Sequence, residues 1–473
     1  MELVKIDDNT WEIPRQGAMH VPARIYASEA LLALVRRDKT LDQARNAACL
    51  PGIVRMSYVM PDAHQGYGFP IGGVAAFDLD EGIISPGGVG YDINCGVRLL
   101  RTDFREEDVT ARRKELLAAI VREVPAGVGK GGVTKLSLGV LKEILVKGAE
   151  WAVAEGYGWP GDLATTEEGG RMREADAAAV SARALERGIP QLGTLGSGNH
   201  FLEFQKVDRI VDPVVAAAFG IGSVGQILVM IHCGSRGLGH QVATDYIEKM
   251  ENEFGVEGLP DRELVHAPLR SDLGREYYRG MCAAVNYAFA NRQMIAHWVR
   301  EVFRKVIGTS DGMRQIYDVC HNVAKMETHM VDGCETRLCV HRKGATRSFG
   351  PSRREIPAAY KSVGQPVIIP GSMGTASYIL AGTDAAEALS FGSTAHGAGR
   401  VMSRQEALRR FRGEKIRDDL AGRGIELQAA GWKGVAEEAS EAYKDVDEVV
   451  RVSDAAGLGR IVARVVPIGV MKG

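Results

Sequence analysis

The chain has 473 residues, of which 45% are hydrophobic and 25% are charged, a composition typical of a globular protein with a large core. Its 58 basic residues nearly balance 60 acidic ones, so net charge gives no sign of a general nucleic-acid binder, and any site for a polyanion must be a local groove. Residues 1–8 lack the apolar core of a signal peptide, and no apolar run approaches the ~18 residues of a membrane span. We therefore expect a cytoplasmic protein without a membrane partner.

The cysteines argue against a disulfide framework. There are seven, an odd number, and they are scattered along the chain without a Cys-x-x-Cys pair. This pattern fits a reducing compartment and disfavours a zinc ribbon or finger.

The first half of the chain alternates short strands with helices. A helix is predicted over 28–37, a β-strand over 72–77 and an amphipathic helix over 106–123. The glycine-rich stretch 127–132 is predicted to be a loop. Residues 139–188, rich in Ala, Glu and Arg, are predicted to form a surface-exposed helical insertion.

The second half carries a strand over 226–231, a long helical region over 275–307 and a capped helix that begins at Ser403. The sequence shows no internal repeat and no Pro/Ser-rich linker. We therefore predict an α+β fold in one large domain, residues 1–473, in which helices surround central β-sheets and glycine-rich loops form a cleft.

A carboxylate and a thiol lie close together in the turn Ser85–Gly96, which follows the strand predicted over 72–77. Asp92 precedes Cys95 by three residues, and the neighbouring glycines allow close backbone approach. A thiolate can bridge two cations, and Asp92 can hold one of them as a harder oxygen ligand. A buried structural cysteine beside a turn aspartate is the alternative interpretation of the same residues.

Two other patterns are weaker. Asp62 and His64 lie in the Gly/Pro-bounded stretch 60–70, which we interpret as a hydrogen-bonded turn. Gly220–Gly225 matches G-x-G-x-x-G by letter, but it precedes a predicted strand instead of following one, so a dinucleotide site is rejected.

Five histidines share a common setting, because each lies beside a short run of apolar or small residues next to Gly, Ser or Arg. They are His200, His232, His321, His341 and His396. Imidazoles brought near Asp92 and Cys95 would form a mixed N/O/S site, which suits a borderline first-row metal better than Mg²⁺ alone.

Four glycine-containing loops are suited to phosphate, because they expose backbone N–H groups beside hydroxyl or guanidinium groups. Each could be an ordinary tight turn, but four together predict a cleft that holds several phosphates. The loops are Gly234–Gly237, His341–Gly344, Pro370–Gly374 and His396–Arg400.

These motifs together resemble the RtcB-type RNA ligases, and the resemblance covers essentially the whole chain. The most specific motifs are Gly90–Gly96, Gly198–Glu203, His232 with Gly234–Gly237, His341–Arg347 and His396–Arg400. The family joins an RNA 3′-phosphate or 2′,3′-cyclic phosphate end to a 5′-hydroxyl end in tRNA splicing and RNA repair.

The resemblance implies two Mn²⁺ ions and a GTP requirement. One ion would be held by Asp92, Cys95 and His200, and the other by Cys95, His232 and His321. His396 would be the nucleophile that takes GMP from GTP. Guanosine contacts are expected at Asn199, His200, Phe201, Leu202, Glu203, His321, Asn322, Pro370, Gly371, Ser372, Met373, Ser377, His396, Gly397, Ala398, Gly399 and Lys472. RNA phosphates are expected near Arg236, Lys343, Arg400 and Arg404. The implied partners are RNA ends such as tRNA halves and an archease-type activator, and we expect a monomer.

Chemistry supports this assignment over two alternatives. No lysine is followed by x-Asp/Asn-Gly, the motif of ligases that use a lysine nucleophile, so a histidine nucleophile remains. A binuclear metal phosphodiesterase or phosphatase would explain Asp92, Cys95 and the histidines, but it gives no role to Glu203, His396 or Lys472. A metal-stabilised RNA-binding protein without enzymatic activity agrees less well with the sequence, because aromatic residues are only 6% of the chain and no signature of an RNA-binding module is present.

Overall fold

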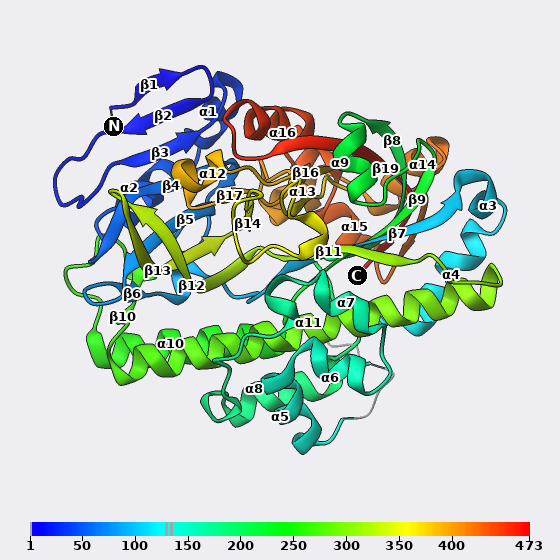
Figure 1. Cartoon of the computed structure of the whole chain (residues 1–473), viewed down its shortest axis with the longest axis horizontal. Helices are drawn as coiled ribbons and strands as arrows, with labels where there is room; N and C mark the ends of the chain where they lie inside the picture. The colour runs from blue at the N-terminus through cyan, green and yellow to red at the C-terminus, as the bar shows by residue number, and fades with distance from the viewer. Residues whose placement is uncertain (1, 128–130, 133–135) are drawn as a thin grey trace.

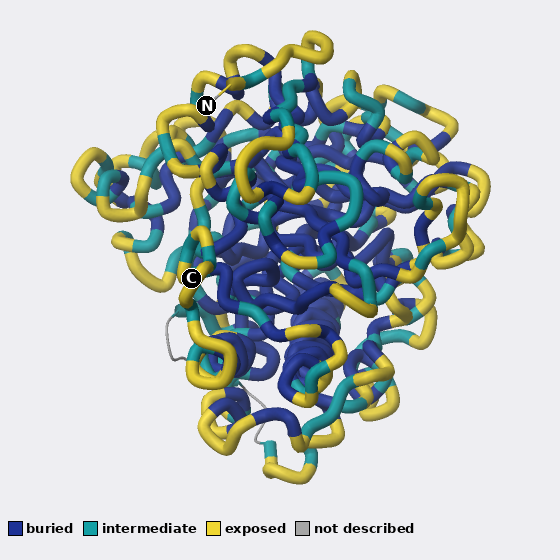
Figure 2. The backbone as a smooth tube through the Cα atoms, turned by 90° about the vertical axis from the view of Figure 1, so that its left-hand side faces the viewer, coloured by how far each residue is buried: buried dark blue, intermediate teal, exposed yellow. Residues whose placement is uncertain are grey.

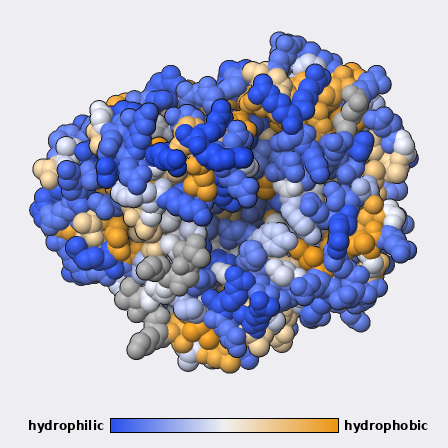
Figure 3. Space-filling model, turned by 180° about the vertical axis from the view of Figure 1, so that it is seen from behind, coloured by the Kyte–Doolittle hydropathy of each residue, from blue (hydrophilic) through white to orange (hydrophobic). Residues whose placement is uncertain are grey.

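The computed structural model describes residues 2–127, 131–132 and 136–473. Two large β-sheets lie above a long helix that crosses the lower part of the molecule (Figure 1). The face seen from behind is largely hydrophilic and is hollowed near its middle (Figure 3). No helix among the described residues combines the length and the apolar character that a membrane crossing requires.

The first sheet is built from strands within residues 4–78 and from a later hairpin. Its strand order is β1-β2-β3-β4-β5-β13-β12. The pairs are antiparallel except for β3 with β4. Its strands are β1 Val4–Asp7, β2 Thr10–Ile13, β3 Ala23–Tyr26, β4 Ile53–His64, β5 Ile71–Asp78, β12 Asn322–Val331 and β13 Cys334–Lys343. The strand predicted over 72–77 is β5.

The second sheet has the order β11-β7-β9-β8-β19-β16-β15, and β18 pairs with β19. Its strands are β7 Gly96–Arg105, β8 Phe201–Ile210, β9 Gln226–Cys233, β11 Arg314–Cys320, β15 Pro366–Ile369, β16 Ser377–Ala381, β18 Glu426–Ala429 and β19 Arg460–Lys472. Two small pairs join β6 Ile83–Ile84 to β10 Ala267–Pro268 and β14 Ala345–Arg347 to β17 Ser393–Ala395.

The register of the second sheet brings several strand ends to one edge. Gly96, the first residue of β7, pairs with Cys233 of β9 and with Cys320 of β11. Phe201, the first residue of β8, pairs with Lys472 near the end of β19. Because neighbouring strands are antiparallel, one strand begins where the next one ends. The residues that flank these ends therefore gather at the same edge.

Helices cover the lower face of the sheets. The longest, α11 (Asp272–Val306), is the helix predicted over 275–307, and most of its residues are buried, including polar ones. Buried backbone runs through the middle of the molecule and exposed backbone through the outer loops (Figure 2). The other helices are α1 Glu29–Val35, α2 Thr40–Ala47, α3 Glu106–Thr110, α4 Arg113–Glu123, α5 Leu138–Lys147, α6 Ala149–Ala154, α7 Pro160–Ala164, α8 Ala182–Gly188, α9 Pro213–Ala218, α10 Arg236–Phe254, α12 Ala385–Ser390, α13 Arg404–Arg410, α14 Gly413–Gly422, α15 Trp432–Glu437 and α16 Val446–Ala455.

Two predicted elements differ from the structure. The helix predicted over 106–123 is divided into α3 and α4, and the Thr110 hydroxyl donates to the Glu106 carbonyl where α3 ends. The segment predicted over 139–188 is helical, but Leu141, Ile144 and Trp151 belong to the largest hydrophobic core. It packs against α11 through this apolar face and is therefore not a purely surface element. Residues 128–130 of the loop predicted over 127–132 lie outside the described residues.

A buried ionic cluster ties α11 to the second sheet. Asp318 of β11 accepts from Arg98 of β7 at 2.6 Å and from Arg292 of α11 at 2.7 Å, and all three side chains are fully buried. Arg292 also donates to the backbone carbonyls of Asn94 at 2.9 Å and Cys233 at 2.8 Å. The same guanidinium therefore holds the turn that carries Asp92 and Cys95 against the end of β9.

We expect Asp318→Ala to lower the free energy of unfolding by about 3–5 kcal/mol, because it leaves two buried guanidinium groups without their carboxylate. Urea denaturation measures this loss. Glu115→Gln, which removes an exposed pair with Arg112, is the control and should change stability little. Equal effects of the two substitutions would contradict a structural role for the buried cluster.

Candidate active site

A first group of possible metal ligands lies at the edge where the strand ends meet. Asp92, Cys95 and His200 each offer an atom within 4.8 Å of the others. His200 Nε2 lies 2.8 Å from Asp92 Oδ2 and 3.6 Å from Cys95 Sγ. Asp92 and Cys95 precede β7, and His200 precedes β8, so the register of these strands sets the spacing of the group.

Two more imidazoles extend this group. His232 Nε2 lies 3.1 Å from Cys95 Sγ, and the rings of His232 and His321 have centroids 5.7 Å apart. Both histidines are buried, and within the described part of the chain neither ring nitrogen of His321 has a hydrogen-bond partner. A buried polar atom without a partner is costly, and a bound cation would use the lone pair that the neutral imidazole carries on one of its two nitrogens.

The protonation preferences of Cys95, His232 and His321 fit a divalent cation. Burial and the Asp92 carboxylate raise the pKa of the Cys95 thiol to about 11, and a cation is the group that stabilises a buried thiolate at neutral pH. Burial lowers the pKa of His232 and of His321 well below the usual value. Both are therefore neutral, the form that binds metals. Oxygen, nitrogen and sulfur donors together match a borderline first-row ion.

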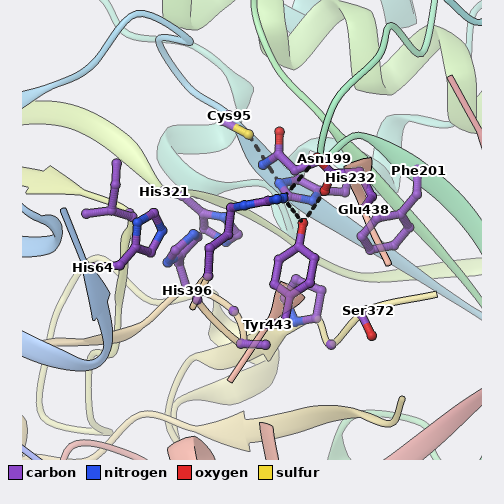
Figure 4. A pocket seen from close by; sticks show the side chains of 18 of the residues that line it. His64, Cys95, Asn199, Phe201, His232, His321, Ser372, His396, Glu438 and Tyr443 are labelled. Carbon is purple, nitrogen blue, oxygen red and sulfur yellow. Dashed lines mark hydrogen bonds and ion pairs between the residues drawn. The ribbon is translucent and has the colours of Figure 1, made fainter. Parts of the chain in front are cut away.

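A cavity of about 330 Å³ opens beside these ligands, a volume within the range of small-molecule sites. Cys95, His232, His321 and His396 all line it, and the rings of His321 and His396 have centroids 5.3 Å apart. Figure 4 shows these side chains converging from separate segments. The cleft thus brings the predicted nucleophile next to the predicted metal ligands.

Asp62 fixes the orientation of His396. Its Oδ2 lies 2.5 Å from His396 Nδ1 and also accepts from the backbone N–H groups of His396 and Gly397, at 3.0 and 3.2 Å. A carboxylate can only accept, so in the neutral imidazole Nδ1 carries the proton and Nε2 has the lone pair. Burial would raise the pKa of Asp62, but the neighbouring His396 and Lys444 hold it below the usual value. A Cβ at Gly399, where φ is +73°, would collide with the Asp62 carbonyl.

The structure places most of the predicted guanosine contacts around the cavity. The lining residues among them are Asn199, Phe201, His321, Asn322, Pro370, Gly371, Ser372, Met373, His396, Gly397, Ala398, Gly399 and Lys472. His200, Leu202, Glu203 and Ser377 do not line it. Leu202 packs into a hydrophobic core, and Ser377 Oγ accepts from the backbone N–H of Gly371 at 3.0 Å. Glu203 lies two residues from Phe201 and so shares its face of β8.

Comparison with known proteins assigns the chain to a family. A family model described as "tRNA-splicing ligase RtcB" matches residues 43–473. The chain belongs to the RtcB family. It is 54% identical over 478 residues to the tRNA-splicing ligase RtcB of Thermococcus kodakarensis, covering 100% of this chain and 99% of that protein. It is likewise 54% identical over 477 residues to the tRNA-splicing ligase RtcB of Pyrobaculum aerophilum, with 99% of each chain covered.

The chain is also similar to the RNA-splicing ligase RtcB of Mycobacterium tuberculosis. The two are 53% identical over 436 residues, which cover 91% of this chain and all of that protein. These matches confirm the resemblance to RtcB, the α+β fold and the prediction of an enzyme of the RNA ligase class.

In this RtcB chain the predicted phosphate contacts have different surroundings. Arg400 and Arg404 line the cavity and pair with Glu438 Oε1 at 3.1 and 3.2 Å. Arg236, whose φ of 56° is unusual for a non-glycine residue, lies with Nη1 3.4 Å from His200 Nδ1. The Lys343 ammonium is buried and donates to the carbonyls of Tyr67, Phe69 and Gly87. Because these three carbonyls hold the ammonium, an RNA contact would require these hydrogen bonds to break. Burial also lowers the pKa of Lys343 to about 7.

Sequence reasoning missed several residues around the cavity, and it grouped His341 with the site histidines although His341 does not line the cavity. Asp62 lies near the end of β4 and not in a turn, and its role depends on a partner more than three hundred positions away. Glu438 and Tyr443 line the cavity, and no local sequence motif predicted either residue. His341, grouped with the site histidines, accepts from the backbone N–H of Ser85 at 3.2 Å and packs against Phe77.

We expect Mn²⁺ to raise the melting temperature of this RtcB protein by a few degrees, because a ligand bound only to the folded state stabilises that state. Cys95→Ala should abolish most of this shift, since Cys95 touches ligands of both predicted ions. Cys49→Ala, which changes a half-buried cysteine, is the control. Differential scanning fluorimetry and metal analysis after dialysis measure both effects. A shift that survives Cys95→Ala would contradict the assignment of the ligand.

Proposed function

We propose that this protein is a GTP- and Mn²⁺-dependent RNA ligase that joins 3′-phosphate or 2′,3′-cyclic phosphate ends to 5′-hydroxyl ends, with tRNA halves or broken RNA as substrates. The observation that carries the proposal is the position of His396. One ring nitrogen of His396 is held by Asp62, and the imidazole lies at the wall of a nucleotide-sized cavity that Cys95, His232 and His321 also line. The names of its RtcB relatives support the class of substrate.

The first step is the transfer of GMP to the enzyme. His396 Nε2 forms a bond to the α-phosphorus of GTP, and the bond to pyrophosphate breaks. Asp62 keeps the proton on Nδ1, orients the ring and stabilises the positive charge that develops on it. Asp92, Cys95 and His200 would hold one ion, and Cys95, His232 and His321 the other. Bound divalent ions would supply positive charge next to the phosphoryl oxygens.

Two further steps complete the joining. An oxygen of the RNA 3′-phosphate attacks the phosphorus of the His396-bound GMP, and the P–N bond breaks. The 3′-end then carries a guanylate that is a good leaving group. The RNA 5′-hydroxyl displaces this GMP as the new phosphodiester forms. A 2′,3′-cyclic phosphate must first be opened by water to a 3′-phosphate. Arg400 and Arg404, which line the cavity, are suited to bind the phosphates of the RNA.

Incubation with α-labelled GTP and Mn²⁺ tests the proposal. We expect an acid-labile protein-bound label that His396→Ala abolishes, because the variant lacks the attacking nitrogen. His341→Ala is the control, since His341 lies outside the cavity lining. Release of phosphate from RNA ends with no labelled protein would instead identify a binuclear phosphatase or phosphodiesterase. RNA binding that is indifferent to GTP and to His396→Ala would identify a binding protein.

The guanine specificity of the proposed enzyme should depend on pH. Burial raises the pKa of Glu203 to about 7, opposed by Gln205 and Lys472. Only the carboxylate can accept from both N1–H and N2–H₂ of guanine. A raised folded-state pKa also means that Glu203 favours folding at low pH and loses this contribution as pH rises through about 7.

We therefore expect the KM for GTP to rise as the pH falls from about 8 to about 6, because protonation of Glu203 competes with guanine binding. Glu203→Gln should remove this part of the pH dependence and reduce discrimination against ATP. Steady-state guanylylation at several pH values measures both effects. An identical pH profile in the variant would exclude Glu203 as the residue that recognises the base.

A further inference from the structure

Three aromatic side chains form a column outside the cavity. The rings of Tyr91 and His240 are stacked, with centroids 4.9 Å apart and an interplanar angle of 25°. Tyr67 also contacts Tyr91, with centroids 5.3 Å apart and an interplanar angle of 59°. Both tyrosines are half-buried and pack against the largest hydrophobic core, whereas His240 is exposed. The column therefore has a fixed base and ends in an aromatic ring that reaches solvent.

This column lies directly beside the predicted metal group. Tyr91 precedes Asp92, and a Cβ at Gly234, at the end of β9, would collide with the Asp92 carboxylate. The first turns of α10, which carry His240, therefore follow directly from the wall of the metal group. The Asp92 carboxylate is 31% exposed, so the group is open to solvent.

The charges around the column differ at its two ends. Burial lowers the pKa of His240, Arg187 lowers it further, and Asp92 opposes them, so both charged groups lie near this ring. Arg187 donates to Gln241, the residue after His240, at 2.9 Å. Arg236 lies one helical turn before His240. Burial raises the pKa of Tyr67, and the nearby Glu263 and Glu251 raise it further. Arg187 and the Asp92 carboxylate thus lie near the exposed end of the column, and Glu251 and Glu263 lie near its buried end.

An exposed aromatic ring beside guanidinium groups is the combination that binds single-stranded nucleic acid. Each base has a π-face that stacks on an aromatic ring regardless of sequence, and arginines hold the backbone phosphates. An acidic peptide would use the arginines but would leave the stacked ring without a function. The exposed ring of His240, the neighbouring Arg187 and the position of Tyr91 next to Asp92 therefore favour an RNA base.

We propose that the outer face of His240, supported by Tyr91 and Tyr67, stacks on an unpaired base of the RNA next to the end that is being joined. The phosphate beside this base would lie against Arg187 and Arg236. This inference rests on the proposed ligase function and adds to it a subsite for RNA with frayed or single-stranded ends.

Ligation kinetics with single-stranded RNA test the subsite. We expect His240→Ala to raise the KM for RNA about tenfold, the loss typical of one stacked base. His240→Phe keeps an aromatic face and should restore the KM to within about twofold of the wild-type value. Phe254→Ala is the matched control, because Phe254 is an exposed aromatic residue at the far end of the same helix.

Two further measurements separate the possible failures. Formation of the His396–GMP adduct involves no RNA, so its rate in each variant reports damage to the metal and nucleotide sites alone. RNA whose ends are held in a perfect duplex has no free base to stack, so its KM should respond less to His240→Ala. If the wild-type protein forms no adduct, the proposed function itself fails. If it ligates normally and His240→Ala leaves the KM for RNA unchanged, or if His240→Phe is as impaired as His240→Ala, the stacking subsite is wrong.

Discussion

The antiparallel register of the second sheet is the constraint on which the site depends. Cys95 and His200 come immediately before strands, His232 is near the end of a strand, and His321 follows one. Pairing in this register puts all four residues at one edge. A shift of the register by one residue would turn the side chains of a strand to the opposite face of the sheet. The predicted metal ligands therefore meet only when the sheet has this register.

Arg292 secures this edge from below. Its guanidinium binds Asp318 and two carbonyls that belong to different strand ends. A lysine could not replace it, because only a planar fork with several donors can satisfy these acceptors at once. Burial makes the cluster costly unless every partner is present, which links the folding of α11 to the shape of the site.

The cavity lies between the two sheets because His321 connects them. β11 of the second sheet ends before His321, and β12 of the first sheet begins immediately after it. From the first sheet come Asp62 at the end of β4 and, through the small β14–β17 pair, His396. The second sheet thus positions the predicted metal ligands, the first sheet contributes Asp62, and the small β14–β17 pair positions the proposed nucleophile His396. This division sets the predicted metal ligands apart from the proposed nucleophile within one cleft.

The sequence alone was sufficient to predict those residues whose chemistry depends on a short local motif. Asp92 with Cys95, the histidines beside glycine loops and the resemblance to RtcB all follow from short stretches of the chain, and the long helix α11 follows from its own pattern. Tertiary structure alone decided the remaining features. Asp62 and Glu438 act through partners distant in sequence, and only the structure shows the buried partners of His341 and Lys343. The segment 139–188 appeared to be a surface insertion because its apolar residues could not be assigned to α11. The physical reason is the same in each case: a side chain's role depends on which groups replace water around it, and long-range packing determines those groups.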